Sequence, residues 1–256
     1  MLKVKNLTIG EGKPDICVPL VSSNLEDLEK ECEALKDSVA NLMEWRVDYL
    51  LNKEDFHATR DLDKAWKIIR KYFPDKPILT TVRTKSQGGA HKTPGGDYIG
   101  LLSLIIASRW ADILDVEYGH EMMDTKVLVS RARKQGIPVL MSYHKFKRAL
   151  SEMEILDVLE NMRFFKPDIE KIAVMPQNYV DVAALISAAA RFDQKHPEIP
   201  VITIGMGEMG VLTRISGNHL GGPITFAAGL NPSAPGQLLC DEVRTLQAII
   251  EQQFYK

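Results

Sequence analysis

The stretch GIPVLMSYH (136–144) carries the pattern that decides the fold of this chain. A glycine and a proline open the stretch, an apolar run follows them, and a histidine ends it. Turn residues directly before a short apolar run are typical of a strand that enters a parallel sheet. The amphipathic segments that flank it, 121–135 and 150–164, are predicted to be helices. This part of the chain therefore predicts a strand with a helix on either side.

Seven other runs repeat this pattern along the chain. They are PDICVPL (14–20), ANLMEWRVD (40–48), PILTTVR (77–83), ADILDVE (111–117), EKIAVM (170–175), PVITIGM (200–206) and PITFAAG (223–229). Further helices are expected between them, at about 24–36, 60–72, 97–109, 179–193, 209–217 and 236–252. Eight strand–helix units in 256 residues favour closure into an α/β fold of the (β/α)8 TIM barrel type, with residues 1–256 as a single domain.

The amino-terminal segments refine this prediction. An open doubly wound sheet is the alternative, but it usually carries a glycine-rich loop after its first strand, and VPLVSSNLED (18–27) contains no glycine. The segment VKNLTIGEGKPDI (4–16) begins outside the repeat and has the pattern of a short hairpin. We expect this N-terminal β-hairpin to close the floor of the barrel.

Composition excludes several classes of function. The net charge of −2 gives no general basic field of the kind that binds nucleic acid or anionic membranes. No apolar run approaches the ~20 residues that a bilayer requires. Three widely spaced cysteines, Cys17, Cys32 and Cys240, suggest neither a disulfide framework nor a zinc site. We expect a cytoplasmic protein without nucleic-acid or membrane partners.

Ionisable residues interrupt the predicted strands near their carboxyl ends, where the active sites of barrel enzymes lie. The alternation of side chains places Glu44, Arg46 and Asp48 on one face of 40–48. The neighbouring strands contribute Arg83, Asp115, Glu117, His144 and Lys171. Buried charges are costly unless they are paired or bind a ligand. One interpretation is an internal lattice of salt bridges, which suits Asp115 and Glu117, and the other is a binding site.

Lys171 and His144 become informative together. Each alone has an ordinary explanation, because a lysine at a strand edge reaches water and a histidine at a strand end is often a simple hydrogen-bonding group. A lysine held in an apolar barrel beside Arg46 and Arg83 should lose its proton more easily and attack a ketone. A histidine on the adjacent strand could move a proton from the neighbouring carbon to a leaving hydroxyl. The pair predicts a lyase.

Two loops and one arginine complete the predicted mouth of the barrel. The glycine-rich segment SQGGAHKTPGGD (86–97) suits a mobile lid. In LNPSAPGQL (230–238), Ser233 and Gln237 could act as hydrogen-bond donors over the site, although this segment could also be an ordinary loop. Arg214 suits a carboxylate, whereas its ordinary explanation is a solvated charge on a helix surface.

At these residues the chain resembles the type I 3-dehydroquinate dehydratases of the shikimate pathway. The resemblance extends over almost the whole chain, and six segments match that family in order. They are EWRVD (44–48), MSYH (141–144), KIAVMPQ (171–177), GVLTRISG (210–217), ITFAAG (224–229) and SAPGQ (233–237). The resemblance implies a Schiff base between Lys171 and the ketone of 3-dehydroquinate, with His144 as general acid and base, and it implies no cofactor, no metal and a homodimer.

The resemblance also implies the residues that bind the substrate. Glu44, Arg46 and Arg83 would hold the ring hydroxyls. Arg214, Ser233 and Gln237 would hold the carboxylate. Apolar contact with the ring would come from Phe226 and Met206.

One departure from the family pattern bears on function. The chain has Gln87 where the family commonly has a glutamate that polarises the histidine, so we expect His144 to have a lower pKa here than in the usual enzyme. Two other functions compete with dehydration. A Schiff-base aldolase or transaldolase would share Lys171 but cleave a carbon–carbon bond. A catalytically impaired binding protein, suggested by Gln87 alone, would keep the pocket without turnover.

Overall fold

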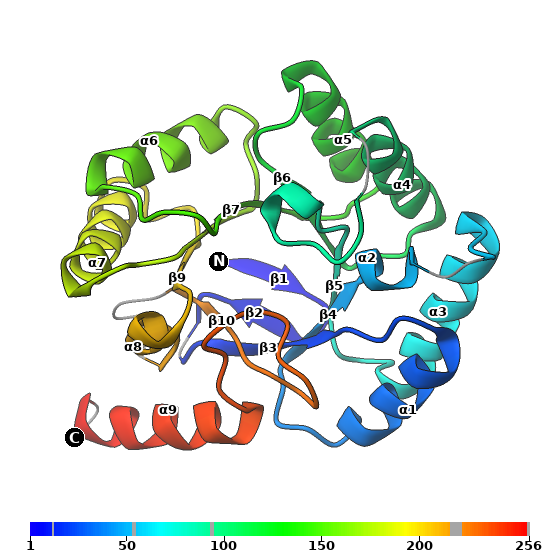
Figure 1. Ribbon diagram of the computed structural model, residues 1–256, viewed down its shortest axis with the longest axis horizontal. Helices are drawn as coiled ribbons and strands as arrows, with labels where there is room; N and C mark the ends of the chain where they lie inside the picture. Colours follow the sequence, from blue (N-terminus) through cyan, green and yellow to red (C-terminus); the bar gives the residue numbers. More distant parts are fainter. Residues whose placement is uncertain (12, 53–54, 93–94, 216–221, 255–256) are drawn as a thin grey trace.

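The computed structural model describes residues 1–11, 13–52, 55–92, 95–215 and 222–254. Eight parallel strands form the wall of a barrel, and helices surround it (Figure 1). The strands are β3 (Asp15–Leu20), β4 (Leu42–Arg46), β5 (Ile78–Thr81), β6 (Ile113–Glu117), β7 (Val139–Lys145), β8 (Ile169–Val174), β9 (Val201–Gly205) and β10 (Ile224–Phe226). Their order is β10-β3-β4-β5-β6-β7-β8-β9, so the predicted (β/α)8 barrel is confirmed.

The ring is nearly closed. Among the described residues a ladder joins β10 to β3, with Ile224 opposite Asp15, but none is recorded between β9 and β10. The backbone still comes close there, because a Cβ added to Gly222 would lie 2.0 Å from the carbonyl oxygen of Val201. Glycine at this position therefore lets the two ends of the sheet meet.

Helices follow the strands and cover the outside of the barrel (Figure 1). They are α1 (Leu25–Leu35), α2 (Val47–Leu50), α3 (Ala58–Tyr72), α4 (Gly95–Ser108), α5 (Met122–Lys134), α6 (Glu152–Arg163), α7 (Tyr179–Lys195), α8 (Val211–Ile215) and α9 (Cys240–Phe254), with 3-10 turns η1 (Lys85–Gln87) and η2 (Glu208–Gly210). Buried apolar stripes such as Leu62, Ala65 and Ile69 of α3 explain why these segments pack against the strands. In the described part of the chain, no helix is long and apolar enough to span a membrane.

The predicted hairpin is present and closes the floor of the barrel. Strands β1 (Leu2–Val4) and β2 (Leu7–Ile9) pair antiparallel and lie inside the ring of strands in Figure 1. Val4 and Ile9 are buried in one apolar cluster with the first inward-facing residue of most barrel strands, for example Leu42 and Ile202. The hairpin thus fills the end at which the strands begin.

The inside of the barrel changes character along its axis. The floor is apolar and consists of Leu42, Leu79, Ile113, Leu140, Ile169, Ile202 and Ile224. Two residues further along the strands come Glu44, Thr81, Asp115, Ser142 and Lys171, and beyond them Arg46, Arg83, Glu117 and His144. Because every second residue points inward, this order of polarity follows from the sequence of each strand.

The structure corrects several predicted boundaries; for example, the strand predicted over 223–229 ends at Phe226, and the strand predicted over 77–83 ends at Thr81. The strand predicted over 40–48 ends at Arg46, and the chain turns into α2, whose Asp48 caps the end of the strand by binding the Arg46 side chain. The helix predicted over 236–252 begins only at Cys240, because Gly236 has a left-handed φ of 74°. The helix predicted over 209–217 is α8 at Val211–Ile215, and 216–217 lie outside the described residues.

Candidate active site

All the residues predicted for the site line one cavity at the carboxyl ends of the strands. The predicted members are Glu44, Arg46, Arg83, Gln87, His144, Lys171, Met206, Arg214, Phe226, Ser233 and Gln237. Gly88, Phe146, Ala173, Ile204 and Ala234 also line it. They come from strands far apart in the sequence, so closure of the barrel is what brings them together.

Lys171 is enclosed in this cavity instead of reaching water. Its side chain is 4% exposed, and Nζ lies 3.4 Å from the centre of the Phe226 ring. Burial lowers the pKa of Lys171 to about 8, Glu44 opposes this effect, and Arg83 adds to it. The strand-edge interpretation is therefore wrong, and the lowered pKa favours the unprotonated, nucleophilic amine.

His144 lies one strand away, on β7, where Ser142 pairs with Lys171. The ring atom Nδ1 is buried and has no hydrogen-bond partner among the described residues. Burial lowers the pKa of His144 well below its usual range, and the cations Arg83, Lys171 and Arg46 act in the same direction. The imidazole is therefore neutral at pH 7 and can accept a proton.

Gln87 touches the main chain of His144 and not its ring. The His144 N–H donates to Oε1 of Gln87 at 2.8 Å, while Nε2 of Gln87 donates to the carbonyl of Tyr118 at 3.0 Å. The Gln87 amide thus links the carboxyl ends of β6 and β7, at the place where the next backbone hydrogen bond between these two strands would lie. Burial and the neighbouring cations lower the pKa of His144 here, whereas the comparison with relatives that carry a glutamate at this position stays a prediction.

Arg83 is held in a fully buried ionic network. It donates to Glu117 at 2.9 Å and to Asp115 at 2.7 Å, and Ser142 bridges Arg83 and Asp115. Glu117 also accepts from the N–H and the hydroxyl of Thr84. The salt-bridge lattice is therefore present, and it fixes one guanidinium at the cavity wall.

The other two polar groups of this wall are also fixed. Glu44 accepts a hydrogen bond of 2.8 Å from Thr81. Arg46 binds Asp48 through two parallel hydrogen bonds of 2.8 Å. Each side chain is held by a neighbour while it lines the cavity, so a ligand meets groups whose positions are already set.

Arg214 differs from Arg46 and Arg83, the other arginines of the cavity lining, because no carboxylate neutralises it within the described residues. It is 2% exposed, and among the described residues it donates only to the carbonyls of Phe226 and Pro235, while its Nε has no partner there. Burial alone lowers its pKa to about 10. A buried guanidinium without a counter-charge is a site for an anion, and a carboxylate matches its planar fork. The interpretation as a solvated surface charge is wrong.

Ser233 and Gln237 lie beside Arg214 in the cavity lining, in the loop before α9. They bind each other: Oε1 of Gln237 accepts from the Ser233 N–H at 2.7 Å, and Nε2 donates to Oγ of Ser233 at 3.1 Å. The Ser233 hydroxyl also donates to Oε1 of Gln237, at 3.3 Å, so within the described contacts the second amide hydrogen of Gln237 is the donor that remains for a ligand.

Sequence reasoning missed three contributors to the site. Ser142 lies two residues before His144 on the same face of β7, so strand alternation could have found it. Asp48 stood on the correct face, but its role depends on a turn that strand alternation does not reveal. Phe146 lines the cavity after β7 has ended, and we find no sequence signal for it.

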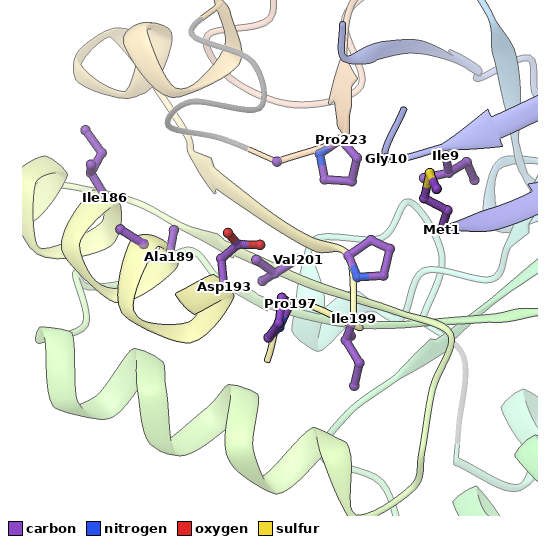
Figure 2. Close-up of a pocket in the computed structure, with 13 residues that line it drawn as sticks. Met1, Ile9, Gly10, Ile186, Ala189, Asp193, Pro197, Ile199, Val201 and Pro223 are labelled. Carbon is purple, nitrogen blue, oxygen red and sulfur yellow. The ribbon is translucent and has the colours of Figure 1, made fainter. Parts of the chain in front are cut away.

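A second cavity lies at the opposite end of the barrel (Figure 2). It is bordered by α7, the start of β9 and the hairpin. Figure 2 shows mostly aliphatic side chains and prolines there, including Ile186, Ile199 and Pro223. Asp193 is the one ionisable side chain among the described residues that line it. Among the described residues that line it, no nucleophile stands beside a base.

Comparisons with known proteins agree with this geometry. A family model described as type I 3-dehydroquinase matches residues 16–253. A 3-dehydroquinate dehydratase of Clostridioides difficile is 36% identical over 254 residues, covering 98% of this chain and 97% of that protein. One of Alkaliphilus oremlandii is 34% identical over 252 residues, covering 98% of both.

Solved structures give the same picture. A crystal structure of type I 3-dehydroquinate dehydratase from Clostridium difficile, with covalently modified comenic acid, has a TM-score of 0.91 at 34% identity and covers 98% of both chains. The enzyme of Enterococcus faecalis has a TM-score of 0.88 at 30% identity and covers 97% of this chain and 99% of that one. The likeness thus includes sequence as well as fold.

Proposed function

Because the chain belongs to the type I 3-dehydroquinase family, and is thus a 3-dehydroquinate dehydratase, we propose that it removes water from its substrate through a Schiff base on Lys171, with His144 as the proton carrier. One observation carries this proposal. Lys171 is a buried amine, and burial lowers its pKa to about 8. It lies beside a neutral histidine. Covalently modified comenic acid in the related crystal structure supports a covalent step.

The proposed cycle begins when the neutral amine of Lys171 attacks the ketone carbon and the carbonyl oxygen leaves as water. The resulting iminium withdraws electrons from the adjacent carbon, so His144 can remove a proton there. The protonated histidine then gives that proton to the hydroxyl on the next carbon, which departs as water. Hydrolysis of the imine consumes one water, releases 3-dehydroshikimate and restores Lys171. The net change is the loss of one water, without a metal or organic cofactor.

Each remaining residue of the cavity has a proposed role in binding. Arg214 would hold the substrate carboxylate, supported by its burial without a counter-charge, and Ser233 and Gln237 would donate to the same group. Glu44, Arg46 and Arg83 would bind ring hydroxyls. Phe226 and Met206 would supply the apolar contacts with the substrate ring. Phe226 would also steady Lys171, since the ammonium lies against its ring.

Borohydride trapping tests the proposal directly. Incubation with 3-dehydroquinate and borohydride should reduce the imine and add a stable mass to the peptide that contains Lys171. Lys171→Ala should abolish both adduct and turnover, because Lys171 is the one lysine among the described residues that line the cavity. Lys76→Ala is the matched control, since Lys76 is half-buried, also has a pKa lowered by burial, and lies outside the cavity.

The same experiment separates the competing functions. Dehydration produces a conjugated enone with new ultraviolet absorbance, whereas aldol cleavage produces an aldehyde and a binding protein produces neither. An adduct on another residue, or full activity of the Lys171→Ala protein, would refute the Schiff-base assignment.

We also propose that the chain works in the cytoplasm as a homodimer. Three buried free cysteines are compatible with a reducing compartment. Light scattering on the protein as it elutes from a size-exclusion column measures its mass. A mass near 28.7 kDa, in place of twice that value, would exclude the dimer.

A further inference from the structure

Asp48 is a fully buried carboxylate that does not itself line the cavity. From the described part of the chain it accepts four hydrogen bonds. Two come from Nε and Nη2 of Arg46, each at 2.8 Å. The others come from the main-chain N–H of Arg83 at 3.3 Å and of Ala90 at 2.8 Å.

These four donors belong to three parts of the site. Arg46 ends β4, Arg83 follows β5, and Ala90 lies in the loop that carries Gln87. That loop is tightly folded, because a Cβ added to Gly89 would lie 1.9 Å from the carbonyl oxygen of Arg83. One carboxylate thus joins a cavity-lining guanidinium to the loop that supports His144.

From these contacts we propose that Asp48 is a positioning residue, which fixes the Arg46 guanidinium and the 84–90 loop in the arrangement that the reaction needs. This inference rests on the proposed function, since it assigns Arg46 to the substrate. Asp48 acts through its neighbours and does not touch the substrate.

The requirement is for a carboxylate and not merely for a polar group. Both oxygens of Asp48 accept from a guanidinium donor and from a main-chain N–H. In Asp48→Asn an amide group replaces one oxygen, and in either orientation it faces one donor of Arg46 together with the main-chain N–H of Arg83 or of Ala90. The fork to Arg46 is then lost, and the guanidinium and the loop are released together.

Asp48→Asn should lower kcat/KM about 100-fold, because displacing a substrate-binding group by roughly 1 Å has effects of that size. KM should rise, and hydrogen exchange at 86–90 should become faster. Asp61→Asn is the matched control: Asp61 is buried, accepts two hydrogen bonds from Arg60 and one from the His57 N–H, and lies outside the cavity. It should lower the melting temperature and leave kcat/KM within about twofold.

A double-variant comparison covers the case in which Asp48→Asn does not fold. Arg46→Met/Asp48→Asn buries no unpaired charge, and it is compared with Arg46→Met alone. Equal kcat/KM values support action through Arg46, and a further loss with faster hydrogen exchange at 86–90 supports action through the loop as well. A further loss with unchanged hydrogen exchange at 86–90 overturns the proposal. Equal losses in Asp48→Asn and Asp61→Asn also overturn it. If the unmodified protein forms no enone from 3-dehydroquinate, the proposed function fails instead.

Discussion

Gln87 uses both ends of its amide, and this makes a prediction about Gln87→Glu. A carboxylate can accept from the His144 N–H but cannot donate to the Tyr118 carbonyl. The new anion also favours the imidazolium, so the pKa of His144 should rise. Because the neutral ring is the base, the acidic limb of kcat/KM should move to higher pH, by about one unit. The melting temperature should fall, since a carbonyl loses its donor.

A pH–rate profile measures this shift. Gln135→Glu is the control, because Gln135 lies on the surface and accepts only from Arg109 in the described contacts. An acidic limb that stays in place or moves to lower pH would contradict the prediction.

Arg214 should act on binding more than on chemistry. Arg214→Met removes a charged hydrogen-bond donor to the substrate carboxylate, so KM should rise roughly 10- to 150-fold, the equivalent of about 1.5–3 kcal/mol. The carboxylate is held alike in the ground state and the transition state, so kcat should change little. Steady-state kinetics test this, with Arg163→Met, which breaks a surface pair with Glu198, as the control. An unchanged KM would remove Arg214 from the binding site.

Which residues face the cavity could be predicted from the sequence, but several of their contacts could not. Strand alternation and the family motifs placed Lys171, His144 and Arg214 in one site. The bridge made by Gln87 depends on the separation of β6 and β7 at their ends, which the order of residues does not encode. The fold is also needed to show that, among the described residues, the buried Nε of Arg214 has no hydrogen-bond partner.

Strand β8 carries two groups with altered pKa values on opposite faces. Lys171 points into the barrel, and Glu170 points toward the helices, where neither of its carboxyl oxygens has a partner among the described residues. Burial raises the pKa of Glu170 to about 8, with Arg163 opposing the effect and Glu160 adding to it. Between about pH 4.5 and pH 8, Glu170 therefore keeps its proton in the folded state, whereas in the unfolded state, with an ordinary pKa of 4.5, it has lost that proton.

This difference predicts that Glu170→Gln stabilises the protein more at pH 8 than at pH 5. Ionisation favours the unfolded state as pH rises from about 4.5 to about 8, by at most on the order of 5 kcal/mol. Glutamine removes that loss. Melting temperatures of variant and parent at both pH values measure the effect. Glu33→Gln is the control, because the pKa of Glu33 lies below its usual value and no titration falls in the window. An equal change at both pH values would show that Glu170 is ionised in the fold.

The elements themselves were largely predictable. All eight strands of the barrel wall were located, because turn residues and apolar runs mark each of them. The predicted end of β4 was wrong. The alternation of side chains continues through Asp48 in the sequence, but the buried contacts of that carboxylate accompany a turn of the chain into α2. Local pattern identifies an element, whereas tertiary contacts decide where it stops.

Across the whole molecule, the floor and the chemistry lie at opposite ends of the barrel. Ile9→Ala should therefore lower the free energy of unfolding by about 2–5 kcal/mol, because a cavity replaces part of a fully buried side chain. Thermal unfolding should show a melting temperature lower by roughly 5–15 °C, while kcat/KM at 25 °C stays the same. Ile249→Ala on the exposed side of α9 is the control. A loss of activity without a loss of stability would mean that the hairpin reaches the site.

The apolar floor under the layers of charge also bears on how such a protein can change through descent. Lineages can exchange the reacting side chains and the loops above them, because the hydrophobic end already secures the architecture. Mutational tolerance should accordingly be graded along the barrel axis, with new specificities arising at the mouth and lethal losses of folding concentrated at the hairpin.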